Sequence, residues 1–437
     1  MKNHMERSSF MLNKKRGLLS MLCVGALLLG GCNSEKQGLK KEYDTQKEVT
    51  LTMFEIDVLN SKVWNDALLA KDDSKIHIIE RTASYYSKDG EKEDYRSYLD
   101  TQLKQDNDID LYIVLDEDIK KLGDAGLFTD LSDLEGIDNL TKTALNTATY
   151  NDKIFAVPLV YAAYGMYWNV DVLNQYGLSV PKNQKEMLSV FETLKKNGIT
   201  PYVGNKGYGL TVPAMVSGLS QVYTSDKKDQ LLNDLKDGKT PISTYMKDGF
   251  DLLELFIDKG YMDKKYALEK TPDESLADFK AGHGVCIAAS SNYDMSDITF
   301  HYEMTSANVL ADGGGFVVTS ARKFAINPSS KQMEYAKEAL SYILKEDNMM
   351  QIAKELKALP PVETDQMDFS YMGNERKDAI HDIYHGITIP MEDTSLPFGE
   401  WEVIRNLGRE MLEGKSSKDV CKEYDQIQQD AIKTEKE

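Results

Sequence analysis

Four aromatic residues lie within eight positions of the stretch VPLVYAAYGMYWN, which covers residues 157–169. They are Tyr161, Tyr164, Tyr167 and Trp168, in a chain of 437 residues that has only 13 Phe and 3 Trp. Aromatic rings at this density either fill a core or offer flat apolar faces to a ligand. Because neighbouring side chains of a strand point to opposite faces, Tyr167 and Trp168 face opposite ways. The pattern therefore indicates a stretch of mixed role.

Acidic residues follow short apolar segments near the start of the folded part. The segments 49–55, 75–81 and 109–115 are predicted strands, and helical spacing separates them at 58–71 and 93–104. This alternation predicts an α/β domain with a largely parallel sheet. Ligands of such sheets bind beyond the carboxyl ends of the strands. At that rim we expect Phe54, Glu55, Asp57, Asp116 and Glu117.

The later part of the chain is rich in helical spacing. Glycine follows one of these helices at position 198, where a left-handed cap is expected. We predict helices at 183–198, 240–259, 273–281, 329–346, 371–384, 400–413 and 416–434, and strands at 284–290 and 314–320.

The first residues predict a secretory signal. Basic residues precede a twelve-residue apolar run at 18–29, which is too short to span a bilayer, and Gly-Gly-Cys32 follows it. The stretch LLGGC resembles the lipobox of bacterial lipoproteins. It implies that residues 1–31 are removed, that Cys32 is lipidated and that 32–48 form a tether on the outer face of a cell membrane, in a bacterium without an outer membrane. The alternative is an ordinary cleaved signal followed by an accidental cysteine.

Charge and cysteine content exclude some classes of protein. Loss of residues 1–31 would remove five basic residues and one acid, which takes the formal charge from −19 to −23. Such an acidic chain disfavours nucleic-acid binding. Only Cys286 and Cys421 would remain in the folded part, so a disulfide framework is excluded and one bridge between them stays open.

Several longer stretches occur in the order found in one known family. They are DIDLYIVLDEDIKKLGDAGLFTDLSDL, NDKIFAVPLVYAAYGMYWNVDVLNQYGLSVPKNQKEML, FKAGHGVCIAASSNYDMSDI, GGGFVVTSARKFAINPSSKQMEYAKEALSYIL and LEGKSSKDVCKEYDQI. Together they resemble the family 1 extracellular solute-binding proteins of bacterial ABC importers, which mostly serve sugars. The resemblance implies a type II fold of two α/β lobes, with the ligand between them and hinge crossings near 160–163, 311–315 and 359–362. Residues 49–160 plus 312–360 would form one lobe, and 161–311 plus 361–437 the other.

The resemblance also implies the partners and the site. We expect a monomer that delivers a carbohydrate to transmembrane permease subunits, with no catalytic residue and no cofactor. Sugars present apolar C–H faces to aromatic rings and hydroxyls to carboxylates. Trp168 matches a packing aromatic of the family, Tyr161 lies at a hinge, and Tyr293 stands where the family often has Trp. The ligand-binding residues predicted are Phe54, Glu55, Asp57, Asp116, Tyr161, Tyr208, Tyr293 and Trp401.

Three alternatives remain open from the sequence. Aromatics and carboxylates also suit a polyamine or another small cation, and 71 acids leave room for the carboxylate pair of a surface glycoside hydrolase. A sensory or adhesive lipoprotein without a transporter is the third. His381 and His385 have the i, i+4 spacing of some zinc ligands but lack a third ligand, so we predict no metal.

Overall fold

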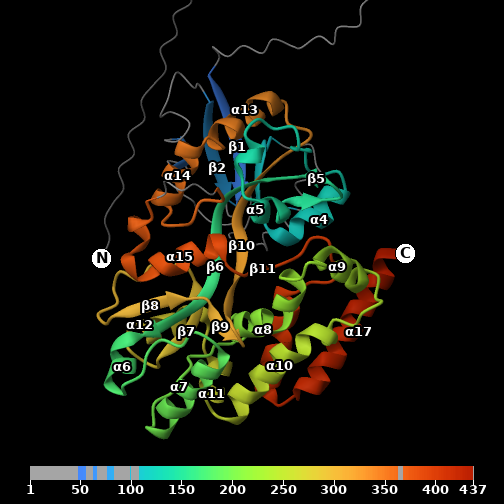
Figure 1. The fold of residues 1–437 in the computed structure, drawn as a ribbon. Coiled ribbons are helices and arrows are strands. Elements are labelled where there is room, and N and C mark those ends of the chain that lie inside the picture. Colours follow the sequence, from blue (N-terminus) through green and yellow to red (C-terminus); the bar gives the residue numbers. More distant parts are fainter. Residues whose placement is uncertain are drawn as a thin grey trace, which may run out of the picture. The chain divides into compact units, whose positions relative to one another are not determined.

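The computed structural model describes residues 48–55, 63–65, 76–82, 99, 108–362 and 368–436. It confirms a mixed α/β architecture in which helices surround one large sheet (Figure 1). The predicted signal, Cys32, the tether up to residue 47 and Asp57 lie outside the described residues.

The predicted strands near the start of the folded part are confirmed. They are β1 (Val49–Glu55), β2 (Ile76–Thr82) and β3 (Leu111–Val114). β1 lies between the other two and pairs with both in parallel. Both faces of β3 and of the carboxyl end of β1 are covered, since all four residues of β3 are buried and so are Met53 and Phe54, whereas Ile79 of β2 is 41% exposed. Their nearly continuous apolar sequence is what a strand covered on both faces requires.

Two long strands continue the sheet and introduce antiparallel pairing. β6 (Val157–Asn169) and β10 (Gly313–Ile326) pair antiparallel in the order β2-β1-β3-β10-β6-β7. The sheet is therefore mixed: β1 to β3 and the pair of β10 with β11 are parallel, whereas β6 pairs antiparallel with its neighbours. The other strands are β7 (Cys286–Ser290), β8 (Tyr302–Thr305), β9 (Ala307–Leu310) and β11 (Thr388–Pro390), with a separate hairpin of β4 (Thr149–Tyr150) and β5 (Lys153–Ile154).

The pairing of β6 with β10 is irregular near its middle. Register shifts separate Thr319 from Arg322 and Arg322 from Lys323. Beside this irregularity, the backbone N–H of Tyr161 in β6 donates to the carbonyl of Leu359 at 2.7 Å. The segment that contains Leu359 therefore pairs with β6 at this point. The fully buried Lys323 forms an ion pair with Asp116, next to the register shift. A bulge at this position bends the strand and increases its twist.

The helices agree with the prediction for most of the later chain. Those predicted are found as α7 (Gln184–Lys196), α10 (Ser243–Asp258), α12 (Pro272–Lys280), α13 (Met333–Ile343), α15 (Lys377–His385), α16 (Trp401–Glu413) and α17 (Ser417–Lys436). The others are α4 (Asp116–Asp124), α5 (Lys142–Asn146), α6 (Val170–Gln175), α8 (Thr211–Tyr223), α9 (Lys228–Lys236), α11 (Lys264–Glu269) and α14 (Glu346–Glu355).

The core is divided along the length of β6. Leu159 and Val160 pack into one cluster of buried residues with Phe324 of β10. Beyond Tyr161, the strand lies between two further clusters, one containing Trp168 and the other containing Tyr167. The first part of the strand and the last part thus belong to different cores. The exact lobe boundaries stay a prediction.

Gly165 in β6 lies where the neighbouring segments approach too closely to leave room for a side chain. A Cβ atom there would collide with the backbone oxygen of Thr305 and the ring of Phe316. We expect Gly165→Ala to lower the free energy of unfolding, measured by urea denaturation, by about 1–3 kcal/mol. The reason is that the backbone atoms it would meet cannot move aside without disturbing the strands.

Gly408 in α16 is the matched control. A Cβ atom there would meet its nearest neighbour, Leu210 Cβ, at an ordinary 3.5 Å. Gly408→Ala should leave the stability unchanged or raise it by about 0.5–1 kcal/mol, since alanine favours helices. Equal stability of the Gly165→Ala variant and the wild type would contradict the close packing described.

Candidate ligand-binding site

Four partly buried aromatic rings lie together beside β6. Tyr164 and Trp401 have ring centroids 5.1 Å apart, and Tyr208 lies 5.1 Å from Tyr164. Tyr208 stacks on Trp401 at 6.1 Å and on Tyr293 at 6.5 Å, with interplanar angles of 28° and 26°. The Tyr208 hydroxyl donates to the Tyr293 hydroxyl at 2.7 Å. We call these four residues the aromatic cluster. Three of its members were predicted as ligand-binding residues, and the structure brings those three together.

The loop that carries Tyr208 is shaped by a buried amide. Asn205 is 1% exposed, and its Oδ1 accepts the backbone N–H groups of Gly207 at 3.0 Å and Gly209 at 3.1 Å. Its Nδ2 donates to Ser275 Oγ at 3.0 Å. Position 207 must be small, since a Cβ there would lie 2.5 Å from Pro272 Cγ. The amide thus folds the backbone around Tyr208 as a side-chain turn.

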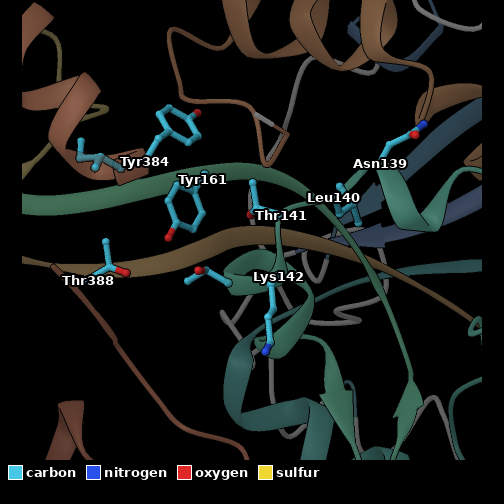
Figure 2. Close-up of a pocket in the computed structure, with 9 residues that line it drawn as sticks. Asn139, Leu140, Thr141, Lys142, Tyr161, Tyr384 and Thr388 are labelled. Atoms are coloured by element: carbon cyan, nitrogen blue, oxygen red, sulfur yellow. The ribbon is translucent and has the colours of Figure 1, made fainter. Parts of the chain in front are cut away.

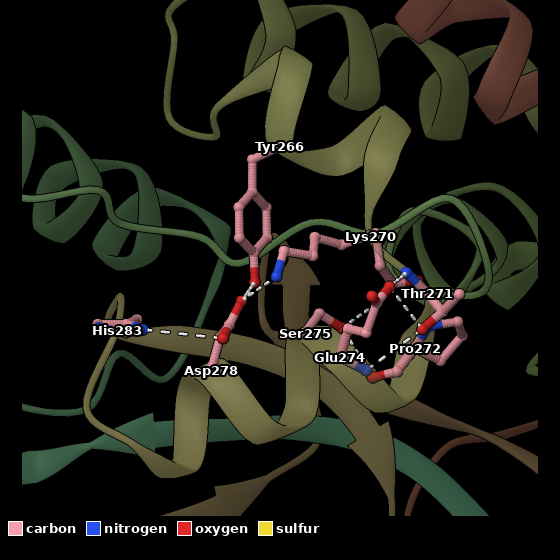
Figure 3. A network of polar contacts seen from close by, with 9 residues as sticks. Tyr266, Lys270, Thr271, Pro272, Glu274, Ser275, Asp278 and His283 are labelled. Carbon is pink, nitrogen blue, oxygen red and sulfur yellow. Dashed lines mark hydrogen bonds and ion pairs between the residues drawn. The ribbon is translucent and has the colours of Figure 1, made fainter.

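The partner of that amide lies in a well-capped helix (Figure 3). Thr271 and Glu274 form a capping box at the start of α12, with Pro272 in its first turn. Ser275 Oγ also donates to the carbonyl of Pro272 at 2.8 Å. Further along the helix, the Asp278 carboxylate accepts the Tyr266 hydroxyl at 2.7 Å. The helix start is therefore fixed, and with it the position of Asn205.

Trp401 is placed by a second buried network. It is the first residue of α16, one position after the predicted start at residue 400, and Pro397 and Gly399 interrupt the chain just before it. The Glu392 carboxylate accepts the backbone N–H groups of Glu400 at 2.8 Å and Trp401 at 3.1 Å. A carboxylate in that place satisfies free helix donors and suits the positive end of the helix dipole. The orientation of Trp401 thus depends on Glu392.

Further acids surround this helix start. Glu400 is fully buried, and its carboxylate accepts the Tyr223 hydroxyl at 3.1 Å and the Asp393 backbone N–H at 2.5 Å. Burial, reinforced by the charge of Asp393, raises the pKa of Glu400. Burial also raises the pKa of Glu392 to about 7, and the charge of Asp116 acts in the same direction. Glu392 and Glu400 therefore hold their protons more tightly than exposed carboxyl groups do.

The acids and the phenylalanine predicted at the rim lie elsewhere or are engaged. Phe54 is fully buried and packs edge-on against Tyr112, because the end of β1 is covered by core rather than open. Asp116 is 8% exposed, accepts Thr319 Oγ1 at 3.0 Å and pairs with Lys323. The side chains of Glu55 and Asp57 lie outside the described residues.

Tyr161 lies apart from the aromatic cluster. It is 3% exposed, its ring stacks on Tyr384 at 6.3 Å, and burial raises its pKa. Three positions separate it from Tyr164, so the two rings point to opposite faces of β6. Figure 2 shows Tyr161 in a separate cavity of about 380 Å³. Its lining is Asn139, Leu140, Thr141, Lys142, Thr143, Tyr161, Ile383, Tyr384 and Thr388.

Tyr167 and Trp168 are both fully buried, which agrees with the packing role expected for Trp168. Trp168 Nε1 donates to Thr305 Oγ1 at 3.1 Å, and the Tyr167 hydroxyl donates to the Ser290 carbonyl at 3.0 Å. Sequence reasoning gave Tyr164 less weight than Tyr161. Strand alternation could have assigned Tyr164 to the cluster, because Tyr164 lies on the same face of the strand as Trp168. Trp401 also packs on that face.

The structure places the two cysteines of the folded part and the two histidines of α15. Cys286 and Cys421 are both buried and free, so they form no bridge. His381 and His385 have ring centroids 4.6 Å apart on α15. Within the described residues no group of three His, Cys, Asp or Glu side chains is placed to hold a metal ion.

Comparison with known proteins defines the class. A model of the bacterial extracellular solute-binding proteins matches residues 89–350, more than half of the chain. The chain therefore belongs to this family. Its members are binding proteins rather than enzymes, which separates the chain from glycoside hydrolases.

The individual proteins that the chain resembles share low sequence identity with it. The multiple sugar-binding protein of Streptococcus mutans is 24% identical over 258 residues, which cover 58% of this chain and 59% of that relative. A family 1 extracellular solute-binding protein from Bifidobacterium longum subsp. infantis superposes with a TM-score of 0.70 at 15% identity, over 86% of this chain and 98% of that one. The solute-binding protein RafE in complex with raffinose superposes with a TM-score of 0.62 at 15% identity, over 88% of this chain and 100% of that one. These structures show a shared type II fold.

The buried carboxyls predict a pH dependence of stability. The folded pKa of Glu392, about 7, lies above the ordinary value of 4.5, so the folded state holds the proton more tightly. The stabilisation is complete below about pH 4.5 and is lost as the pH rises through 7. We expect a loss on the order of 2 kcal/mol between pH 5 and pH 8, at 1.4 kcal/mol per pKa unit.

Thermal unfolding at a series of pH values measures this effect. Glu392→Gln should flatten the profile over that range, whereas Glu413→Gln, at an exposed position of α16, should keep the wild-type profile. A wild-type melting temperature that rises steadily from pH 5 to pH 8 would show that the carboxyls are ionised in the folded state.

Proposed function

We propose that the protein is a membrane-tethered receptor that captures a sugar or oligosaccharide and delivers it to an ABC permease. The observation that carries this proposal is the aromatic cluster, in which Tyr208 stacks on both Trp401 and Tyr293. Membership of the solute-binding family supports it, as do the names of a multiple sugar-binding relative and a raffinose complex.

The chemistry of the cluster suits a pyranose. Stacked rings match the apolar C–H faces of a sugar, and a ring contact of this kind contributes about 0.5–1.5 kcal/mol beyond the buried area. Tyr208 and Tyr293 add hydroxyl groups that can donate and accept hydrogen bonds. The rings remain partly exposed, which leaves surface for a ligand to cover.

The acids around Trp401 favour a neutral ligand over a polyamine, whereas the exposed Asp273 carboxylate acts on the Tyr208 and Tyr293 hydroxyls. A cation would gain most from free carboxylates beside the rings. Asp116 is neutralised by Lys323, and Glu392 is engaged with the start of α16. Because burial raises the pKa of Glu392 and Glu400, these groups also carry less negative charge at neutral pH. We therefore propose a sugar rather than a polyamine as the ligand.

We further propose the lobe division and a hinge. Residues 49–160 plus 312–360 would form one lobe, and 161–311 plus 361–437 the other. The change of core along β6 supports a boundary near Tyr161. The register shifts of β10 lie at the same level, and an irregular strand pair bends more easily than a regular ladder. Closure of two lobes around a ligand is a common hinge motion.

The anchor and the location are proposals that rest on the first residues. Cys32 in LLGGC would carry a diacylglycerol, whose two acyl chains give stable membrane attachment. The folded part would then lie on the extracytoplasmic face, as a monomer that engages the permease subunits. None of the helices that the structure describes has the length and apolar character needed to cross a membrane.

A thermal-shift screen with sugars and polyamines tests the ligand class. A tight ligand raises the melting temperature by mass action. We expect stabilisation by an oligosaccharide such as raffinose or a maltodextrin and none by spermidine. Stabilisation by spermidine and by no sugar would contradict the proposal.

Trp401→Ala tests the site with the same ligand. Loss of a stacking ring should weaken binding by about 1–3 kcal/mol, or roughly 5- to 150-fold, as measured by calorimetry. The stability without ligand should change little, because the ring is only partly buried. Trp168→Phe is the matched control: it should lower the stability and leave the affinity of the folded protein unchanged. A Trp401→Ala variant that binds as wild type but unfolds several degrees earlier would assign the ring to the core.

Cys32→Ser tests the anchor. Because the lipid is attached to the thiol, the variant should be released from the membrane or stay unprocessed. Cell fractionation with metabolic labelling by a fatty acid measures both. A variant that matures normally and stays in the membrane would exclude the lipobox.

A further inference from the structure

The turn after β7 presents Tyr293 to the aromatic cluster. Its own backbone offers little support, since the Tyr293 N–H bonds to the Ser290 carbonyl at a long 3.3 Å. At its start the turn is held to β6, because the Ser291 N–H donates to the Ala163 carbonyl at 2.7 Å. One residue further on, Asn292 Nδ2 donates to the Tyr161 carbonyl of β6 at 3.0 Å, and just after the ring Lys280 Nζ donates to the Asp294 carbonyl at 2.9 Å. Neither of these bonds reaches the carbonyl of Tyr293 itself.

Arg376 supplies that contact from a distant part of the chain, just before α15. Its Nη1 donates to the Ser291 carbonyl at 2.8 Å, and its Nη2 donates to the Tyr293 carbonyl at 2.8 Å. The side chain is 5% exposed, and its guanidinium lies over the Tyr167 ring at 5.8 Å. Hydrogen bonds from a charged donor are the stronger kind. One buried cation thus joins both ends of the turn.

Packing alone does not hold the turn on this side. A cavity of about 340 Å³ lies next to it, lined among others by Tyr293, Tyr302, Tyr371 and Arg376. A void provides no atoms to resist displacement. The carbonyls of Ser291 and Tyr293 would also be left without these donors if the guanidinium were removed.

We infer that Arg376 is a positioning residue, which fixes the Tyr293 ring where it stacks on Tyr208. The inference rests on the proposed function in so far as the aromatic cluster is the ligand site. Displacement of the turn would separate the two hydroxyls that now lie 2.7 Å apart. A ligand that stacks on the cluster would then lose one ring.

The planar fork of arginine is the essential property. Two parallel donors reach two carbonyls two residues apart, whereas the ammonium group of lysine is a compact point charge on a flexible stem. Arg376→Lys keeps the positive charge but cannot reproduce both bonds in the same geometry. Arg376→Met keeps the apolar stem and removes the charge. The pair separates the effect of geometry from that of charge.

Hydrogen–deuterium exchange of the full mature chain without ligand tests the positioning role. We expect exchange at residues 292–296 to become at least tenfold faster in both variants, while α15 and α16 keep wild-type rates. Tyr261→Phe is the control: it removes a bond to Glu192 away from this turn and should leave the turn unchanged. Unaltered exchange at 292–296 in both variants would overturn the inference. So would loss of folding in both variants, since Arg376 would then serve general stability.

Calorimetry with raffinose, or with whichever sugar in the panel stabilises the wild type most, completes the test. Both variants should bind at least tenfold more weakly at a temperature where each is fully folded. Wild-type affinity together with a loosened turn would overturn the link between the turn and the ligand. If no sugar binds the wild type, the proposed function fails, and the exchange measurement still decides whether Arg376 holds the turn.

Discussion

The antiparallel pairing of β6 with β10 constrains most of what surrounds it. Because side chains alternate along β6, Tyr164 and Tyr161 must serve opposite faces. One face receives Tyr208 and Trp401, and the other receives Tyr384 and its cavity. The pairing also links the separate cores, since each end of the strand packs into a different cluster. The position of the aromatic cluster is thus set by strand alternation before any ligand is considered.

Two of the four rings lie in irregular segments and a third lies at a helix start, and each of these three places is fixed by a buried polar side chain. Asn205 shapes the loop of Tyr208, Glu392 holds the start of α16 beneath Trp401, and Arg376 bonds the turn of Tyr293. Loops lack the regular backbone ladders of strands, so such contacts must supply the order. Each is costly to break, because it would leave buried polar groups unsatisfied. A binding surface built in this way is preorganised, which reduces the entropy lost when a ligand binds.

Local patterns in the sequence predict the elements better than the contacts among them. Trp401 at a helix start follows from Pro397 and Gly399, and the burial of β3 follows from its apolar run. α8 was missed because Pro213 and Gly218 obscure its period, although proline is tolerated in a first turn. Asn205, Glu392 and Arg376 could not be found locally, since their roles depend on where the fold brings their partners. The burial of Phe54 could not be found locally either, because it depends on Tyr112 packing against it.

The central claim is that the aromatic cluster is the ligand site. A crystal structure with a bound oligosaccharide measures this most directly. The account predicts a sugar ring stacked against Tyr208, Tyr293 or Trp401, on the face of β6 that Tyr164 occupies. A sugar bound instead in the cavity between Tyr161 and Tyr384, with the four rings uncovered, would contradict it.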